Sequence, residues 1–145
     1  MVFLQLWRES KIHAIRLNGK GEPPTDVWVS QKPGPVESSL LYYRGLVYAL
    51  MDNGALVCLD GKTGDEQYRE RLGAACNSSP VASDGHLVLS DNDGKTFVAQ
   101  AGRTCQVLAT NPLDERITAS PAITGNWLIY RTDSHLYCIG KGDGP

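Results

Sequence analysis

The sequence has neither an excess of one charge nor a long apolar run. Its 145 residues contain 14 Lys and Arg against 16 Asp and Glu, a formal net charge of −2. This balance lacks the basic footprint of a nucleic-acid-binding protein. No apolar stretch approaches the roughly 18 residues of a membrane-spanning helix, and the first residues lack the length and basic region of a secretory signal. We therefore expect a soluble chain without a visible export signal, which also fits the mature or truncated end of an exported protein.

Helical periodicity and closely spaced cysteines are missing as well. No segment places apolar residues at the 3.6-residue period of an amphipathic helix, which excludes helical repeats. The four cysteines are separated by gaps of 18, 29 and 33 residues, whereas a zinc knuckle or a redox motif needs pairs at close spacing. Instead, 15 glycines and 8 prolines separate short apolar runs. This pattern is typical of short strands joined by tight turns.

What the sequence does contain is a repeat of about forty residues. Ser39, Ser79 and Ser120 open three copies at spacings of 40 and 41 residues. Within a copy, short apolar runs are separated by turns such as Asp52-Asn53-Gly54, because Asn and Gly tolerate positive φ. Four short strands repeated at this period indicate the blades of a β-propeller. The predicted fold is therefore all-β, built of four-stranded antiparallel blades in an incomplete ring of about three blades.

The repeat also divides the chain, which we expect to form one propeller domain. Residues 37–76 and 77–117 each supply a complete blade, and residues 118–145 supply a partial blade without its fourth strand. Residues 1–36 supply the outer strands of another partial blade, with His13–Leu17 as a third strand and Asp26–Gln31 as a fourth. Asn18-Gly19-Lys20 then takes the place of the Asp60-Gly61-Lys62 turn. An open arc leaves unpaired strand edges, which invite partner pairing.

Cysteine, histidine and serine have structural interpretations in this pattern. Cys58 and Cys138 share one repeat position, at which the middle copy has Val98, so we interpret both as small buried apolar groups. The roles of Cys76 and Cys105 stay open. The three scattered histidines are interpreted as surface or turn residues: His13, His86 and His135. The serines at the starts of the innermost strands are interpreted as small residues that fit where blades converge: Ser38, Ser39, Ser78, Ser79 and Ser120.

Two segments carry a family resemblance. They are Leu59-Asp60-Gly61-Lys62-Thr63-Gly64-Asp65-Glu66-Gln67-Tyr68 and Ser79-Pro80-Val81-Ala82-Ser83-Asp84-Gly85. The chain resembles the PQQ-like repeat β-propellers, also called quinoprotein alcohol dehydrogenase-like, a mostly bacterial family with BamB-like members. The resemblance implies a blade-docking motif formed by Asp60, Thr63, Gly64 and the trailing Tyr68, where Trp is usual. In the second copy Ala101–Cys105 replaces the Thr-Gly element.

The same resemblance raises the possibility of a quinone cofactor, which the residues do not support. Quinoprotein enzymes of this family use a metal, usually calcium, and a catalytic carboxylate, and calcium takes about six to eight oxygen ligands. Asp91-Asn92-Asp93-Gly94 lacks the alternating acidic spacing and the distant Glu of a calcium loop, and as a hairpin turn it needs no ion. We therefore predict no catalytic residue, no metal ligand and no cofactor.

The favoured hypothesis is a non-catalytic propeller segment that acts as a scaffold for a protein partner or a small ligand on its face. The candidate binding-face loops contain Asp52, Asn53, Asn92, Asp93, Thr132 and Asp133. Two alternatives stay open: the C-terminal fragment of a PQQ-dependent dehydrogenase, and a structural chain that self-assembles through its open blade edges. The resemblance implies the periplasm or the cell envelope, and we expect no nucleic-acid partner.

Overall fold

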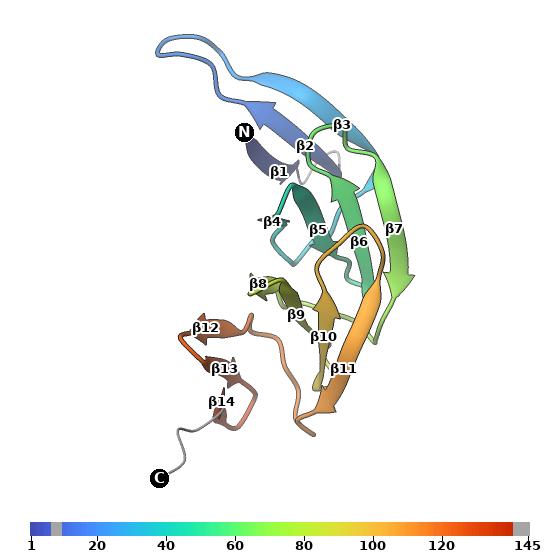
Figure 1. Ribbon diagram of the computed structural model, residues 1–145, viewed down its shortest axis with the longest axis vertical. Coiled ribbons are helices and arrows are strands. Elements are labelled where there is room, and N and C mark those ends of the chain that lie inside the picture. Colours follow the sequence, from blue (N-terminus) through green and yellow to red (C-terminus); the bar gives the residue numbers. More distant parts are fainter. Residues whose placement is uncertain (7–9, 141–145) are drawn as a thin grey trace.

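The fourteen described strands form four antiparallel sheets that lie side by side in an arc (Figure 1). The structure is a computed structural model that describes residues 1–6 and 10–140. Its strands are β1 (Val2–Leu6), β2 (Lys11–Arg16), β3 (Thr25–Pro33), β4 (Leu41–Tyr43), β5 (Leu46–Leu50), β6 (Ala55–Asp60), β7 (Glu66–Arg71), β8 (Val81–Ser83), β9 (His86–Ser90), β10 (Lys95–Gln100), β11 (Gln106–Pro112), β12 (Ala122–Thr124), β13 (Trp127–Arg131) and β14 (Leu136–Gly140). Among these residues there is no helix with the length and apolarity that crossing a membrane requires.

The sheets follow one another along the chain, as expected for propeller blades. The first sheet contains β1–β3 and the fourth contains β12–β14, whereas the second (β4–β7) and the third (β8–β11) have four strands each. Figure 1 shows β4, β8 and β12 on the concave side of the arc and β3, β7 and β11 on the convex side. The all-β prediction is confirmed, and within the described residues the fourth sheet lacks an outer strand.

The first sheet differs from its prediction in two ways. It has a further strand, β1, which pairs with β2 from Val2↔Ile15 to Leu6↔Lys11. The strand β2 also ends earlier than expected. Because Arg16 pairs with Thr25 at the end of β2, Arg16 and not Asn18 occupies the position that Asp60 has at the end of β6. The hairpin that follows is longer than its counterparts, and the Asn18 side-chain amide donates to the Pro23 carbonyl oxygen within it.

Two-residue turns join the first two strands of the second and third sheets. Arg44 and Gly45 have φ of 51° and 81°, and Asp84 and Gly85 have φ of 46° and 79°. Two successive positive φ values define the turn type whose twist matches that of the flanking strands. The sequence places these turns correctly, although Arg44 is an uncommon residue in this conformation.

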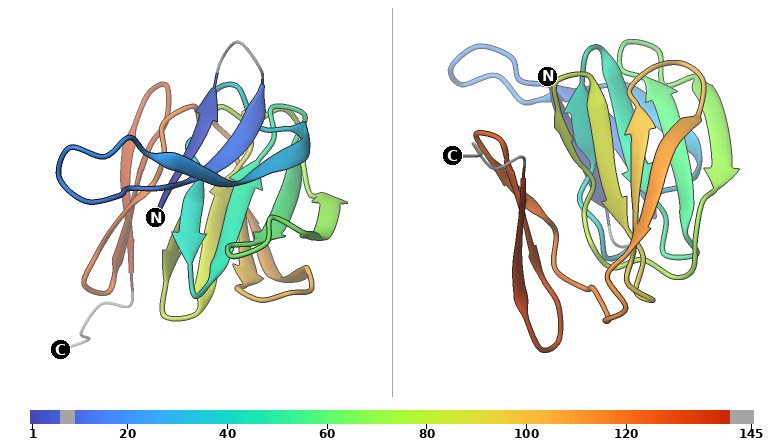
Figure 2. Two further views of the ribbon diagram at one scale, coloured as in Figure 1. Left: turned by 90° about the horizontal axis from the view of Figure 1, so that it is seen from above. Right: turned by 60° about the horizontal axis from the view of Figure 1, so that its bottom comes forward.

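The core consists of three seams, in each of which two neighbouring sheets pack face to face (Figure 2). The strand β5 shows why, because all five of its residues are buried. Side chains alternate between the two faces of a strand, so Val47 and Ala49 pack in the first seam, between sheets one and two, while Tyr48 and Leu50 pack in the second seam, between sheets two and three. The third seam contains Ile117 and Tyr130.

A ladder of hydrogen bonds joins the sheets where the innermost strands begin. The Ser39 N–H donates to the Ser79 Oγ at 2.8 Å, and the Ser79 N–H donates to the Ser120 Oγ at 2.8 Å. The preceding serines tie each inner strand to its own sheet, since the Ser38 Oγ donates to the Leu50 carbonyl and the Ser78 Oγ to the Ser90 carbonyl. These serines therefore carry specific hydrogen bonds in addition to being small.

We predict that Gly54→Ala destabilises the fold far more than Gly45→Ala. Both glycines have positive φ, 83° and 81°, but a Cβ on Gly54 would lie 2.0 Å from the Ala74 carbonyl oxygen, whereas a Cβ on Gly45 would meet nothing within 4 Å. Urea denaturation should show a loss of about 1–2 kcal/mol for Gly45→Ala from the backbone alone, and of about 4 kcal/mol for Gly54→Ala. Equal losses would contradict the close approach of the linker.

Candidate functional site

The predicted docking motif is a rigid turn between β6 and β7. The Asp60 Oδ1 accepts hydrogen bonds from the Lys62 and Thr63 N–H groups at 2.8 and 3.2 Å. The Thr63 Oγ1 donates to the Asp65 Oδ2 at 2.6 Å, and Gly64 has φ of 79°. These bonds satisfy the polar groups of the turn and fix its shape without a ligand.

The turn receives an aromatic residue from the preceding sheet. A Cβ on Gly64 would lie 2.7 Å from the Trp28 ring, so that the indole can rest there only because residue 64 has no side chain. The Trp28 Nε1 donates to the Gly61 carbonyl oxygen at 3.2 Å. The sequence did not pair Trp28 with this turn, because the two lie in different copies of the repeat.

Tyr68 reaches forward into the second seam rather than back to its own turn. Its position in β7, opposite Cys58, corresponds to that of Trp28 opposite Ala14. Tyr68 packs against the cluster that includes Cys58, with Cys105 at its edge, and burial raises its pKa. Cys105 occupies the position that Gly64 has in the second sheet. A smaller aromatic ring and a larger turn residue thus replace the Trp–Gly pair.

An ion pair also crosses the second seam. The Arg103 guanidinium donates to the Asp60 Oδ2 at 2.6 Å and to the Gln67 Oε1 at 2.7 Å. The hydrogen bond from Arg103, followed by that from the Lys62 N–H, lowers the pKa of Asp60. The third sheet lacks the Thr-Gly element but supplies this guanidinium to the turn before it.

The six residues of the candidate binding-face loops lie in equivalent turns of the second, third and fourth sheets. The inner ones hold the linkers between sheets. The Asp52 carboxylate accepts hydrogen bonds from the Val36 and Glu37 N–H groups, and the Asn92 side-chain amide bonds to Asn77. Buried Thr132 donates to the Glu115 carboxylate at 2.5 Å. The outer residues, Asn53, Asp93 and Asp133, are exposed.

The acidic turn of the third sheet is held by backbone N–H groups of the turn itself and of the preceding linker. Asp91 is fully buried. Its Oδ1 accepts from the Asp93 and Lys95 N–H groups, and its Oδ2 accepts from the Ala74 N–H. No group of three or more potential ligands that could hold a metal occurs in residues 1–6 and 10–140.

The histidine and cysteine interpretations hold only in part. His13 is buried in β2, so its interpretation as a surface or turn residue is wrong, and its Nδ1 lies 3.1 Å from the Asp26 carboxylate. Exposed His135 agrees with its interpretation, and it contacts Glu115.

Cys58 is buried as predicted, and burial raises its pKa to about 12. Cys138 is exposed, contrary to prediction, because its face of β14 has no sheet against it in the described part of the chain.

Glu115 is a polar centre that the repeat pattern did not reveal. It lies in the linker between the third and fourth sheets and accepts hydrogen bonds from the Thr132 Oγ1, the Tyr137 hydroxyl and the His135 ring. The hydrogen bond from Thr132 is the main cause of the lowered pKa of Glu115. Linker residues fall outside the conserved spacing of turns and strands, so only the fold brings these groups together.

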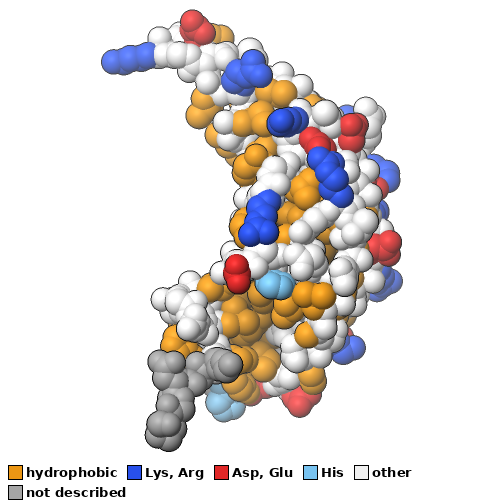
Figure 3. All heavy atoms as spheres, viewed as in Figure 1, with side chains coloured by type: hydrophobic (Ala, Val, Ile, Leu, Met, Phe, Trp, Pro, Cys, Tyr) orange, Lys and Arg blue, Asp and Glu red, His pale blue; other side chains and the backbone are white. Residues whose placement is uncertain are grey.

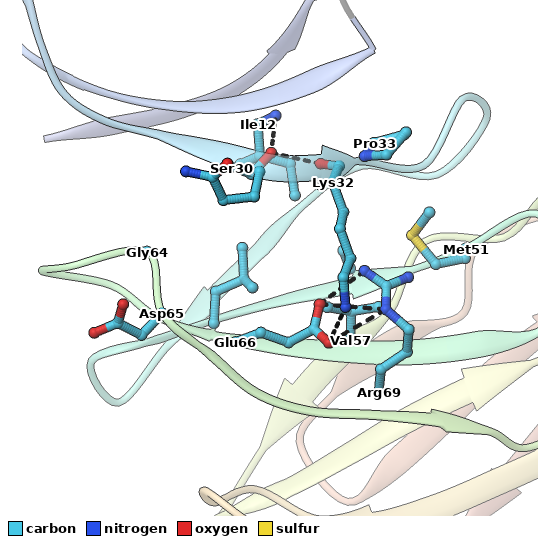
Figure 4. A pocket seen from close by; sticks show the side chains of 13 residues that line it. Ile12, Ser30, Lys32, Pro33, Met51, Val57, Gly64, Asp65, Glu66 and Arg69 are labelled. Atoms are coloured by element: carbon cyan, nitrogen blue, oxygen red, sulfur yellow. Dashed lines mark hydrogen bonds and ion pairs between the residues drawn. The ribbon is translucent and has the colours of Figure 1, made fainter.

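The first seam contains a recess of about 250 Å³. Apolar side chains line its interior, and a charged group of Lys32, Glu66 and Arg69 lies at its rim (Figure 4). Elsewhere on the face shown in Figure 3, Lys and Arg side chains are spread over the upper and middle crescent, while hydrophobic atoms are exposed between them and over the lower part. No single charged patch dominates this face.

The geometry agrees with comparisons to known proteins. The family model described as outer membrane protein assembly factor BamB matches residues 5–144. The chain belongs to this family. The BamB protein of Salmonella typhimurium is 25% identical over 124 residues, which cover 80% of this chain and 31% of that protein. The chain thus spans about a third of the length of this curated relative.

Solved structures show the same fold at lower identity. The crystal structure of BamB from Moraxella catarrhalis matches with a TM-score of 0.73 and 19% identity, over 92% of this chain and 41% of that one. A europium-containing methanol dehydrogenase matches with a TM-score of 0.60 and 14% identity, over 70% of this chain and 21% of that one. The BamB-like propeller is therefore the fold of this chain, and the PQQ-like repeat is confirmed.

We predict that the pKa of Asp60 rises in Arg103→Gln. Because the pKa of Asp60 is lower in the folded chain than in the unfolded chain, ionised Asp60 stabilises the fold at a pH above its unfolded-state pKa. This contribution is lost as the pH falls through the folded-state pKa of Asp60. Without Arg103 this acid-dependent contribution should shrink. A titration of the Asp60 carboxyl carbon by NMR measures the change, and Arg116→Gln is the control. An unchanged Asp60 pKa would mean that the backbone N–H groups of the turn suffice.

Proposed function

We propose that this chain is a non-catalytic BamB-like propeller segment that acts as a binding scaffold for a protein partner. The observation that carries the proposal is the row of equivalent turns on three successive sheets. In each turn one side chain is tied to the neighbouring linker, through Asp52, Asn92 or Thr132. A surface that is fixed before binding loses little conformational entropy when a partner docks.

The character of this face indicates the chemistry of the partner. The exposed outer residues of the turns are Asn53, Asp93 and Asp133, and exposed Asp114 lies in the linker beside the third-sheet turn, where the Leu113 N–H donates to the Gly94 carbonyl. Acidic and amide side chains of this kind attract a partner surface with Lys and Arg. We infer that the partner presents a basic surface to these turns.

The interpretation as a scaffold rests on how the polar side chains of the repeat are used. The carboxylates of Asp52, Asp60 and Asp91 accept hydrogen bonds from backbone N–H groups. A carboxylate engaged in this way stabilises a turn and is poorly placed to exchange a proton with a substrate. The polar residues of the repeat thus serve its architecture.

Family membership supports a cellular role as a further part of the proposal. The Salmonella relative is named as an outer membrane protein assembly factor. We propose that this chain likewise contributes to the assembly of outer membrane proteins and works in the cell envelope. Because it spans only about a third of that relative, the residues that it contributes are those of one arc of a propeller.

We predict that Asp93→Asn with Asp133→Asn weakens this role without unfolding the chain. The gene product, expressed in Salmonella typhimurium lacking BamB, should raise the abundance of outer membrane proteins. The double variant should show a smaller effect, because removal of two charges at the rim of an interface weakens binding by about fivefold to tenfold. Its thermal midpoint should stay unchanged.

The control carries the same loss of charge on other turns, through Glu22→Gln with Asp84→Asn. It should support assembly as the wild-type chain does. If the wild-type chain has no effect, the role in assembly is wrong. If both double variants behave alike, the partner does not bind through the turns named here.

Self-assembly remains the second candidate, because the outer faces of the two end sheets are apolar. Leu4 and Leu6 are exposed on the first sheet, and Trp127 and Leu136 on the fourth, where Leu136 is 72% exposed. Sheet faces of this kind are covered when blades pack side by side, so a second copy could cover them. Light scattering distinguishes the candidates: a monomer contradicts self-assembly, and a defined dimer supports it.

The likeness to methanol dehydrogenase concerns the fold alone. A dehydrogenase activity would depend on blades outside this arc, so we place it below the scaffold. Addition of the quinone and calcium to the gene product should leave its absorption spectrum equal to the sum of the components. A new band on mixing would favour the dehydrogenase alternative.

A further inference from the structure

The recess in the first seam exists because two side chains are smaller there than at the same positions in the second seam. Ala49 and Val57 face the first sheet, and forty residues later Leu89 and Phe97 occupy the equivalent positions facing the second sheet. All four are buried. In the second seam the Phe97 ring fills the space so tightly that a Cβ on Gly73 would lie 2.9 Å from it. The second seam therefore shows how the same positions pack when larger side chains fill the space.

The interior of the recess is largely apolar, with Ser30 and Gln31 as uncharged polar residues of its lining. Ile12 lines it from the first sheet, and Ala49, Val57 and Leu59 line it from the second. Ligand sites are mostly apolar with a few placed polar groups. An apolar cavity of about 150 Å³ in another protein holds benzene, so a recess of about 250 Å³ has room for a ring with a short chain.

Two cations and one carboxylate come together at the rim of the recess. The Lys32 Nζ lies 2.9 Å from the Glu66 Oε1, and the Arg69 Nη2 lies 2.9 Å from the Glu66 Oε2. Figure 4 shows these three side chains converging, while Asp65 lies apart. The Asp65 carboxylate instead accepts from Thr63. Lys32 and Arg69 thus share the Glu66 carboxylate. Because Lys32 is exposed, its side chain can turn toward the carboxylate of a ligand.

We propose that this recess binds a small organic monocarboxylate, with its apolar body between Ala49 and Val57 and its carboxylate on Lys32 and Arg69. The planar guanidinium of an arginine matches the geometry of a carboxylate. Lys32 and Arg69 lie close enough together to contact the same carboxylate, because both bond to Glu66. The site lies in the first seam and approaches the turns of the proposed protein-binding face only at Met51. Its test, binding of a small carboxylate, does not depend on that function.

The test uses 4-phenylbutyrate as the probe and 4-phenylbutan-1-ol as its neutral analogue. Titration of the ¹⁵N-labelled chain at low salt should give saturable shifts at the residues lining the recess, with a Kd of about 0.1–1 mM for a ligand of this size. The alcohol should bind more weakly. If no saturable shifts occur at these residues, the proposal is wrong.

Two filling variants test the place of binding. Val57→Phe and Ala49→Leu introduce the residues of the second seam, and each should abolish the shifts. Because filling a cavity adds buried apolar contacts, each variant should keep or raise the thermal midpoint. Undiminished binding in a folded filling variant overturns the proposal, and the single Ala49→Leu exchange serves if Val57→Phe does not fold.

Charge variants test the carboxylate contact. Lys32→Gln should weaken binding of the acid about fivefold and leave that of the alcohol unchanged. The matched control is Lys95→Gln, an exposed lysine outside the recess, which should alter neither affinity. Equal losses for acid and alcohol in Lys32→Gln, or no loss for the acid, would show that the rim does not recognise the carboxylate.

Discussion

The fold depends on one interaction, the packing of neighbouring sheets against each other through their apolar faces. A blade of this kind is apolar on both sides, as β5 shows with five buried residues in succession. A single sheet therefore has no stable form in water, and each seam supplies the apolar contact that two sheets share. Stability consequently resides between the repeats rather than within them, and every residue that crosses a seam acts on two blades.

This packing explains how the polar residues are distributed. Turns and linkers contain most of them, and there they satisfy backbone groups that the strands leave open. The serine ladder of Ser39, Ser79 and Ser120 repeats at the inner edge, while Asp60 and Arg103 link two turns elsewhere. Both connect adjacent sheets. Polar contacts thus fix how the sheets are spaced, and the apolar seams provide the cohesion.

The sequence predicted the features that depend on local pattern, such as hairpin positions. It failed for the burial of side chains, which depends on the neighbouring sheet. Turn residues located the hairpins at Arg44-Gly45 and Asp84-Gly85, and the repeat located the short fourth sheet. The same repeat gave Cys138 the burial of Cys58, because it specifies the direction of a side chain but not what lies opposite. The recess was missed for this reason too, since the small size of Ala49 and Val57 leaves a space only where Ile12 of the first sheet lies opposite. Glu115 and its partners come together only in the folded chain.

The replacement of Trp28 and Gly64 in one seam by Tyr68 and Cys105 in the next has an evolutionary consequence. A side chain at residue 64 would collide with the indole, so this glycine cannot change before the tryptophan does. The two positions belong to different repeats, yet substitutions at them are accepted only in a certain order. The residue that one repeat tolerates at such a position therefore depends on its neighbour, and the two blades are constrained as a pair.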